Sequence, residues 1–160
     1  MAVIADTHMP RGARRLPAAC VERLRAADLI LHAGDVVGEE VFEELTALGP
    51  PVRAVHGNVD DAALCERLPE TLVVDVVGVR IGMTHDPGPR AGRESRLAAR
   101  FPGCAAVVYG HTHEPTVARA GETWILNPGS PTERRRAPSH TMLVLEVGRD
   151  AITPHLIAFT

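Results

Sequence analysis

Lysine is absent from this chain, and all 17 basic residues are arginine. A guanidinium group matches phosphate oxygens well, but a bias along the whole chain indicates a GC-rich genome more than a binding site. Aromatic residues make up only 3% of the sequence, so a surface that stacks nucleic-acid bases is not expected. The formal net charge of −3 gives no bulk attraction to nucleic acid either, and no nucleic-acid partner is predicted.

Cysteines and long apolar runs are also scarce. Cys20, Cys65 and Cys104 are odd in number and widely spaced, which fits neither a disulfide framework nor a zinc knuckle. No segment approaches the roughly 18 apolar residues of a membrane-spanning helix. The N-terminal stretch "MAVIADTH" lacks the basic start and long apolar core of a secretory signal. We therefore expect a cytoplasmic protein with no membrane partner.

The length and the apolar content set the domain organisation. A chain of 160 residues with 45% hydrophobic residues can bury one real core and is short for two. A single domain over residues 1–160 is predicted.

The first half of the chain alternates apolar runs with amphipathic stretches. This pattern predicts strands at 2–5, 29–32 and 52–56, with helices at 17–27 and 39–48 between them. A strand–helix–strand order of this kind favours a parallel sheet with helices packed on it.

The second half reads differently, because strands there follow one another in pairs. Antiparallel pairs are expected to dominate this half, and two packed sheets with helices outside would bury all the strands. The predicted elements are two strands within 71–85 around a turn at Val77–Gly78, a helix at 93–101, a strand at 105–110, a hairpin at 116–126 turning at Ala120–Gly121, and a hairpin at 140–159 turning at Gly148–Asp150.

Metal-capable side chains stand at the ends of five predicted strands. Because the carboxyl ends of parallel strands meet at one sheet edge, we expect these side chains to converge. Their donors are oxygen and nitrogen without thiolate, which suits Mn²⁺ first, and also Ni²⁺, Fe²⁺, Zn²⁺ or Co²⁺, over Ca²⁺. Each short motif alone is ordinary in loops and turns, so the conjunction carries the prediction. Seven donors are too many for one ion and fit two: Asp6, His8, Asp35, Asn58, His85, His111 and His113.

The order of these motifs resembles the calcineurin-like metallophosphoesterase superfamily. The residues that carry the resemblance are Asp6-x-His8, Gly34-Asp35, Gly57-Asn58, His85 and Gly110-His111-Thr112-His113. The small size, "GNVD" at 57–60 and "NPGS" at 127–130 are similar to the compact YfcE-like phosphodiesterases. The similarity runs from Ala2 to about Val147.

This resemblance implies an α/β fold, a four-layer α/β/β/α sandwich of two mixed sheets flanked by helices. It also implies a role for each candidate ligand. Asp35 would bridge two divalent ions. Of the remaining ligands, Asp6, His8 and His113 would hold the first ion, and Asn58, His85 and His111 the second.

The resemblance further implies a hydrolase that acts on phosphoric ester bonds of a small substrate, with a phosphodiesterase favoured. Attack would come in line from a hydroxide that bridges the metals. Asp35, Asn58 and His111 are the expected catalytic residues. Asn58 and Arg11, which follows the first motif closely, are the candidate substrate contacts.

Two positions depart from the pattern of the larger phosphatases. Val59 stands where those enzymes carry a histidine general acid, so substrates with good leaving groups should react best. His85 is followed by Asp86-Pro87, where relatives often have His-Gly-His.

Other polar residues near the motifs are given supporting roles. His32 and His56 are interpreted as structural rather than as substitute acids. The run Arg134–Arg136 is interpreted as a solvated loop rather than a phosphate clamp, and "NPGS" as a turn that supports the site.

Three alternatives remain open at this point. A phosphomonoesterase fits the same ligand set. A metal-binding protein-interaction scaffold is possible on the same fold, since "DTHMPRGARRLP" at 6–17 resembles the start of the retromer scaffold subunit. A nuclease ranks lower, because the chain has no extra domain or basic face. The oligomeric state is open, with a homo-oligomer compatible.

Overall fold

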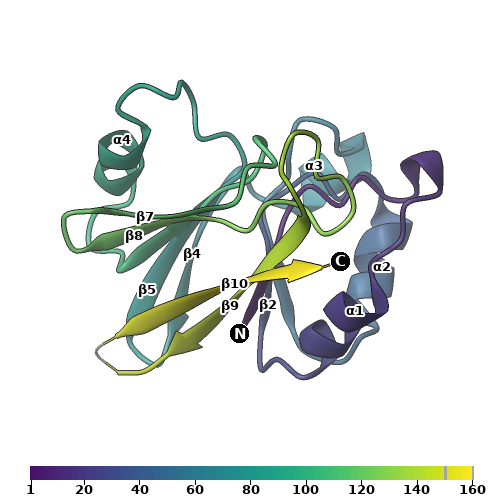
Figure 1. Ribbon diagram of the computed structural model, residues 1–160, viewed down its shortest axis with the longest axis horizontal. Helices are drawn as coiled ribbons and strands as arrows, with labels where there is room; N and C mark the ends of the chain where they lie inside the picture. Colours follow the sequence, from purple (N-terminus) through teal and green to yellow (C-terminus); the bar gives the residue numbers. More distant parts are fainter. Residues whose placement is uncertain (150, 160) are drawn as a thin grey trace.

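Two five-stranded sheets form the framework of the molecule (Figure 1). The structure, a computed structural model, describes residues 1–149 and 151–159. The first sheet has the order β10 (Ile152–Phe159), β9 (His140–Val147), β1 (Ala2–Ile4), β2 (Ile30–His32) and β3 (Val52–Ala54). The second has the order β4 (Thr71–Val76), β5 (Val79–Thr84), β6 (Ala106–Val108), β8 (Thr123–Asn127) and β7 (Thr116–Ala120).

Both sheets are mixed, as the resemblance implied. Three adjacent strands of each sheet run parallel to one another: β1, β2 and β3 in the first sheet, and β5, β6 and β8 in the second. Antiparallel pairs form most of the second half, as expected, but β6 pairs in parallel with both β5 and β8. Helix α4 connects β5 to β6, and a strand–helix–strand crossover of this kind places the two strands parallel to each other.

The molecule is a four-layer sandwich in which helices, the first sheet, the second sheet and a helix follow one another. Three clusters of buried apolar residues fill the spaces between these layers. Alternate residues of β1 show the division, since Val3 packs between the two sheets and Ile4 packs under the helices of the first sheet. On β6, Val108 lies in the layer between the sheets, whereas Val107 faces α4. Strands buried on both faces read as continuous apolar runs, which is the pattern in these segments.

Short helices lie outside the two sheets in the described part of the chain. Helices α1 (Ala18–Arg25) and α2 (Glu39–Thr46) flank the first sheet, and α4 (Arg93–Arg100) flanks the second (Figure 1). The predicted helices at 17–27 and 39–48 end slightly earlier than expected. Helix α3 (Ala62–Arg67) and the 3-10 turn η1 (Arg11–Ala13) were not predicted, because segments this short carry little periodicity.

The hairpin turns lie close to their predicted positions. Val77 and Gly78 both adopt positive φ between β4 and β5, as a tight two-residue hairpin turn requires. The β7–β8 turn lies at Gly121–Glu122, one residue later than expected. The predicted turn at Gly148–Asp150 includes residue 150, which lies outside the described residues.

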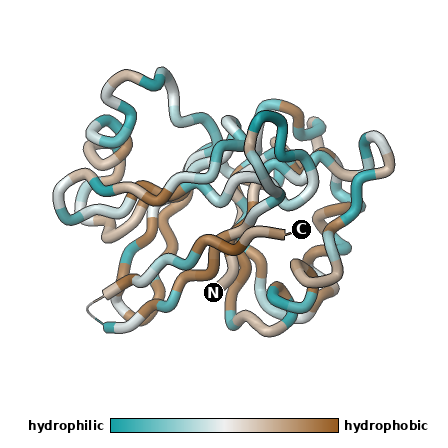
Figure 2. Tube along the Cα trace, viewed as in Figure 1, coloured by the Kyte–Doolittle hydropathy of each residue, from teal (hydrophilic) through white to brown (hydrophobic). Residues whose placement is uncertain are grey.

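Apolar residues concentrate along the strands and polar residues along the loops (Figure 2). Within the described residues, every helix is too short and too polar to cross a bilayer. The polar loops gather at the edge where the parallel strands end, which positions the site described below.

A tight contact between β5 and α4 gives a test of this packing. A Cβ added to Gly82 would lie 2.6 Å from Cδ1 of the buried Phe101 ring. We therefore expect Gly82→Ala to lower the free energy of unfolding by about 1–3 kcal/mol, measured by urea denaturation. Gly148→Ala is the matched control, because its nearest atom would be 3.9 Å away. Equal stability of the two variants would contradict the described packing.

Candidate metal centre

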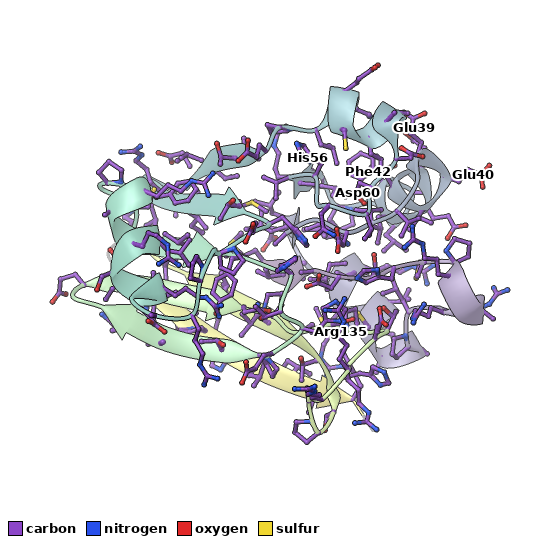
Figure 3. All side chains as sticks on the ribbon, turned by 90° about the horizontal axis from the view of Figure 1, so that it is seen from above. Glu39, Glu40, Phe42, His56, Asp60 and Arg135 are labelled. Carbon is purple, nitrogen blue, oxygen red and sulfur yellow. The ribbon has the colours of Figure 1, made fainter. Side chains whose placement is uncertain are left out.

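All seven candidate ligands come together at one edge of the sandwich. Each lies in a loop that follows a strand: β1, β2 and β3 of the first sheet, and β5 and β6 of the second. Figure 3 views the molecule from the side of this edge. The expected convergence of strand ends is thus found in the structure, although the metal-ligand roles of the residues stay predictions.

The first group of side chains is buried. Asp6, His8 and His113 are each less than 5% exposed, and their ligand atoms lie within 4.8 Å of one another. The Nε2 atoms of His8 and His113 are 3.2 Å apart. Nε2 of His113 also lies 3.4 Å from Oδ1 of Asp6.

The second group reaches the surface. Nε2 of His85 lies 3.3 Å from Oδ1 of Asp35 and 3.1 Å from Oδ1 of Asn58. Nδ1 of His111 lies 2.9 Å from the same Asn58 oxygen. Asp35 and His85 are buried, whereas Asn58 and His111 are exposed. The second group therefore forms the mouth of the site.

Asp35 belongs to both groups. Its Oδ1 faces His85, and its Oδ2 lies 3.4 Å from Nε2 of His8. One carboxylate thus presents one oxygen to each group, which is the arrangement that a bridging ligand needs.

The histidine tautomers direct lone pairs into the centre. Nδ1 of His85 lies 2.8 Å from the carbonyl oxygen of Ala33, and Nδ1 of His113 contacts the carbonyl oxygen of Glu133. A carbonyl oxygen can only accept, so both Nδ1 atoms carry the hydrogen in the neutral rings. Both Nε2 lone pairs then face carboxylate oxygens. Electron-rich atoms at these distances repel one another unless a proton or a metal cation lies between them.

Buried polar atoms show that a divalent cation fits here. Oδ2 of Asp6 is buried and has no hydrogen-bond partner within the described residues. Burial raises the pKa of Asp6 to about 7, because the loss of water around the carboxylate outweighs the nearby charge of His85 and the hydrogen bond from the N–H of His111. Burial also lowers the pKa of His113 to about 4, which leaves the neutral imidazole that binds metals.

Charge attraction is strongest around the bridging carboxylate. Burial disfavours the charged forms of both Asp35 and His85, but their contact outweighs it. The contact lowers the pKa of Asp35 to about 2 and raises the pKa of His85 above its ordinary value. Asp35 is therefore ionised at neutral pH and draws positive charge into the site.

The backbone of the site is held in an uncommon conformation. Left-handed φ values occur at Asp6 (55°), His8 (46°), Asp35 (59°), His111 (68°) and His113 (57°). This region costs a residue with a Cβ roughly 1–2 kcal/mol. The surrounding sheets must hold these turns in place. At "GHTH", the left-handed turns on both sides of Thr112 let His113 join the first group and His111 the second.

Two glycines allow the loops to approach closely. A Cβ on Gly57 would overlap Oδ1 of Asp35. A Cβ on Gly34 would lie 2.7 Å from Nδ1 of His85, and Gly34 has a φ of +90°. Both motifs therefore need glycine for space, and the "GD" motif also needs it for its backbone conformation.

Asp60 joins the loops that carry Asp35 and Asn58. Its Oδ1 accepts from the backbone N–H of Val37 at 2.7 Å, and its Oδ2 from those of Gly57 and Asp35 at 2.7 and 3.2 Å. Sequence reasoning missed this role. Its one signal was the position of Asp60 two residues after Asn58, where a carboxylate can bond to the preceding turn.

Further groups support the site from behind. His32 is buried and bonds to Thr7 and to the N–H of Gly34, and burial lowers its pKa to about 3. It is structural, as predicted. Asn127 of "NPGS" donates to Gly110, and its side chain also accepts from Gly129, so the motif is a supporting turn. Nδ1 of His56 is buried without a partner in the described part of the chain, and its role stays a prediction.

Two arginines are of interest near the site, the predicted substrate contact Arg11 and the loop residue Arg135. Arg11 lies exposed in η1, and the described residues give its side chain no hydrogen bond or ion pair with the ligands, so its substrate role stays a prediction. Arg135, expected in a solvated loop, is exposed, but its Nη1 donates to the carbonyl oxygen of His111 at 3.5 Å. Its charge also acts on Asp6, His8 and His113.

Removal of the Asp60 carboxylate tests how the two loops are held. Asp60→Ala leaves three backbone N–H groups without their acceptor, so we expect the free energy of unfolding to fall by about 2–4 kcal/mol. Asp75→Ala is the matched control, since exposed Asp75 accepts only from the N–H of Gly78. Its loss should stay below about 1 kcal/mol. Chemical denaturation measures the free energy of unfolding of both variants. Equal losses in the two variants would contradict the role of Asp60 in joining the two loops.

Comparisons with known proteins agree with this geometry. A family model described as "Calcineurin-like phosphoesterase superfamily domain" matches residues 1–150. A "Probable metallophosphoesterase" of Methanothermobacter thermautotrophicus is 33% identical over 157 residues, which cover 97% of this chain and 90% of that protein.

Two solved structures share the fold. Vps29 from Entamoeba histolytica, crystallised with zinc, has a TM-score of 0.78 at 23% identity and covers 99% of this chain and 98% of that one. A protein described as a novel archaeal phosphodiesterase has a TM-score of 0.75 at 19% identity and covers 98% of each chain. With the family model matching nearly the whole sequence, this chain belongs to the calcineurin-like phosphoesterase superfamily.

Proposed function

We propose that this protein is a phosphodiesterase that depends on two divalent metal ions, with Mn²⁺ as the first candidate and Ni²⁺, Fe²⁺, Zn²⁺ or Co²⁺ as others. The observation that carries the proposal is the position of Asp35, whose two oxygens face one ligand group each. Asp6, His8 and His113 would hold the first ion. Asn58, His85 and His111 would hold the second.

Two ions in such a site supply an activated water near neutral pH and offset the negative charge of the phosphoryl oxygens. The chain's own residues hold this arrangement in place. Carbonyl oxygens of Ala33 and Glu133 fix the rings of His85 and His113, so that neither ring must turn to bind. Asn58 and His111 line the open mouth, where the substrate phosphate would enter, and Asn58 is the candidate contact to it.

The leaving group receives no proton from the position next to Asn58, since Val59 has no titratable atom. Activated esters with good leaving groups should therefore react fastest. A diester carries two substituents on its phosphate, so its site needs room on both sides. We take a cleft of about 750 Å³, whose lining includes His113, as the room for the second substituent, and this favours the diesterase over the monoesterase.

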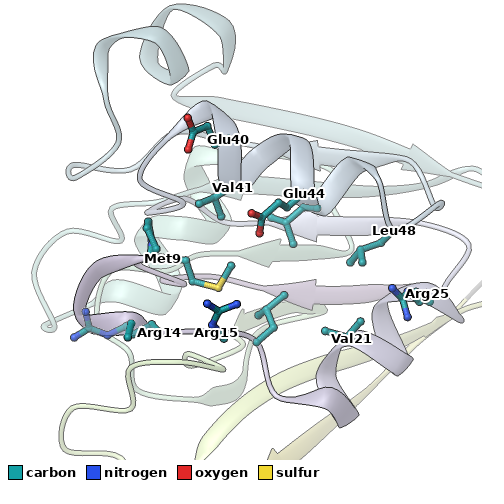
Figure 4. A pocket seen from close by; sticks show the side chains of 13 residues that line it. Met9, Arg14, Arg15, Val21, Arg25, Glu40, Val41, Glu44 and Leu48 are labelled. Atoms are coloured by element: carbon teal, nitrogen blue, oxygen red, sulfur yellow. The ribbon is translucent and has the colours of Figure 1, made fainter.

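A protein-binding scaffold on the same fold is the second candidate function. The observation that favours it is a groove of about 450 Å³ between the segment from Met9 to Arg25 and helix α2. Figure 4 shows its lining, in which Met9, Val21, Val41 and Leu48 lie among arginines and glutamates. This mixed lining specifies no partner. The complete set of seven converging ligands supports the enzyme.

Hydrolysis of bis(p-nitrophenyl) phosphate by metal-loaded protein tests the proposal. Asp35→Asn keeps the side-chain shape but removes the bridging charge, so we expect kcat to fall by at least about a thousandfold. Glu146→Gln, an exposed change on β9, is the control and should retain wild-type activity. Chelation with EDTA should abolish wild-type activity, and Mn²⁺ should restore it.

Two outcomes would overturn the proposal. One is hydrolysis by folded Asp35→Asn at a rate close to that of the wild type. The other is wild-type protein that binds no divalent metal and cleaves neither a diester nor p-nitrophenyl phosphate, which would favour the scaffold.

A further inference from the structure

A second feature of the same edge is a basic cleft beside the first ligand group. The cleft has a volume of about 750 Å³ and includes His113 in its wall. Three loops build it: the β5–α4 loop with Arg90, the β6–β7 loop with residues 112–115, and the β8–β9 loop with residues 134–138. These segments are far apart in sequence and meet only in the folded chain.

The cleft carries a strong excess of positive charge. Among the described residues, Glu114 is the only acidic residue in its lining. The lining also holds four arginines: Arg90, Arg134, Arg135 and Arg136. The formal net charge of the whole chain is −3, so this concentration runs against the overall balance. Like charges gathered in one concave space repel one another, and a bound anion relieves that repulsion.

Two of these guanidinium groups have no other partner. The side chains of Arg90 and Arg136 are exposed and make no hydrogen bond or ion pair with any described residue. Arg134 donates to the carbonyl oxygen of Ala137 at 2.8 Å, and Arg135 to that of His111 at 3.5 Å. Several N–H donors of all four groups thus stay available, in the planar geometry that suits phosphate.

The arginine-bearing loop is tied to the candidate metal centre. Oγ of Ser130 donates to the carbonyl oxygen of Asp6 at 2.7 Å, and Oγ1 of Thr132 donates to that of Thr7. The ring of His113 donates to the carbonyl oxygen of Glu133, the residue before Arg134. These bonds hold the basic cleft at a set position relative to the centre, as a subsite for one ligand requires.

We propose that the substrate is a phosphodiester that carries a second phosphate group, and that the cleft of Arg90, Arg134, Arg135 and Arg136 binds this second phosphate. The inference rests on the proposed function, because it names the substrate class for the same centre. The cleft acts on the part of the substrate that does not react, and so selects which diester is placed at the metals.

A pair of chromogenic substrates tests this selection. Thymidine 5′-(p-nitrophenyl phosphate) and its 3′-phosphorylated counterpart have the same leaving group and differ by one phosphate. We expect Mn²⁺-loaded wild type to show a kcat/KM at least about tenfold higher for the 3′-phosphorylated substrate. In Arg90→Ala/Arg136→Ala, the ratio of the two values should fall toward one.

A charge-matched control separates the cleft from general electrostatics. Arg23→Ala/Arg53→Ala also removes two exposed arginines, but neither residue lines the cleft. This variant should keep the wild-type ratio. Calorimetric titration of metal-free protein in EDTA with thymidine 3′,5′-bisphosphate supplies a readout without catalysis. Its Kd should rise about tenfold or more in Arg90→Ala/Arg136→Ala only.

The outcomes separate the two proposals. Equal cleavage of both substrates by the wild type, or a ratio unchanged in Arg90→Ala/Arg136→Ala, overturns the cleft proposal and leaves the diesterase standing. Equal weakening of bisphosphate binding in both double variants also overturns it. Failure of metal-loaded wild type to cleave either substrate contradicts the diesterase itself, and the cleft proposal falls with it.

Discussion

The arrangement of this molecule depends on electron-rich side-chain atoms that face one another and need positive charge between them. Carboxylate oxygens and imidazole lone pairs from both sheets face one another in a buried space, with Asp35 between the two groups. Hydrogen bonds from His85 and His113 to backbone carbonyls keep the rings from turning away. Such an arrangement is unfavourable without positive charge, and two divalent cations would convert its repulsions into bonds.

The double-sheet framework holds this arrangement in place. Five ligands sit in left-handed backbone turns, each of which is unfavourable by itself. Strands β1, β2 and β6 are buried on both faces, so their ends have little freedom to relax. Asp60 then locks the β2 and β3 loops together through three backbone N–H groups. Packing in the apolar layers thus holds the candidate ligands in their left-handed backbone conformations, with their side chains placed to bind metal.

Sequence reasoning predicted the parts that follow from strand periodicity. Because parallel strands deliver their carboxyl ends to one edge, the convergence of Asp35, His85 and His113 could be expected from spacing alone. The direction of β6 and the short helix α3 were missed, since apolar runs do not encode strand direction and six residues show little periodicity. Arg135 was missed for a different reason. Its approach to His111 depends on how a long irregular loop is tied to β1, and composition does not reveal that.

Anomalous X-ray scattering from crystals soaked in Mn²⁺ tests the central claim most directly. If the seven converging ligands bind two divalent ions, two manganese peaks should appear about 3.5–4 Å apart, and Asp35 should contribute one oxygen to each. The Nε2 atoms of His85 and His113 should lie beside different peaks. A single manganese peak, or no peak in crystals soaked at a saturating Mn²⁺ concentration, would contradict the account.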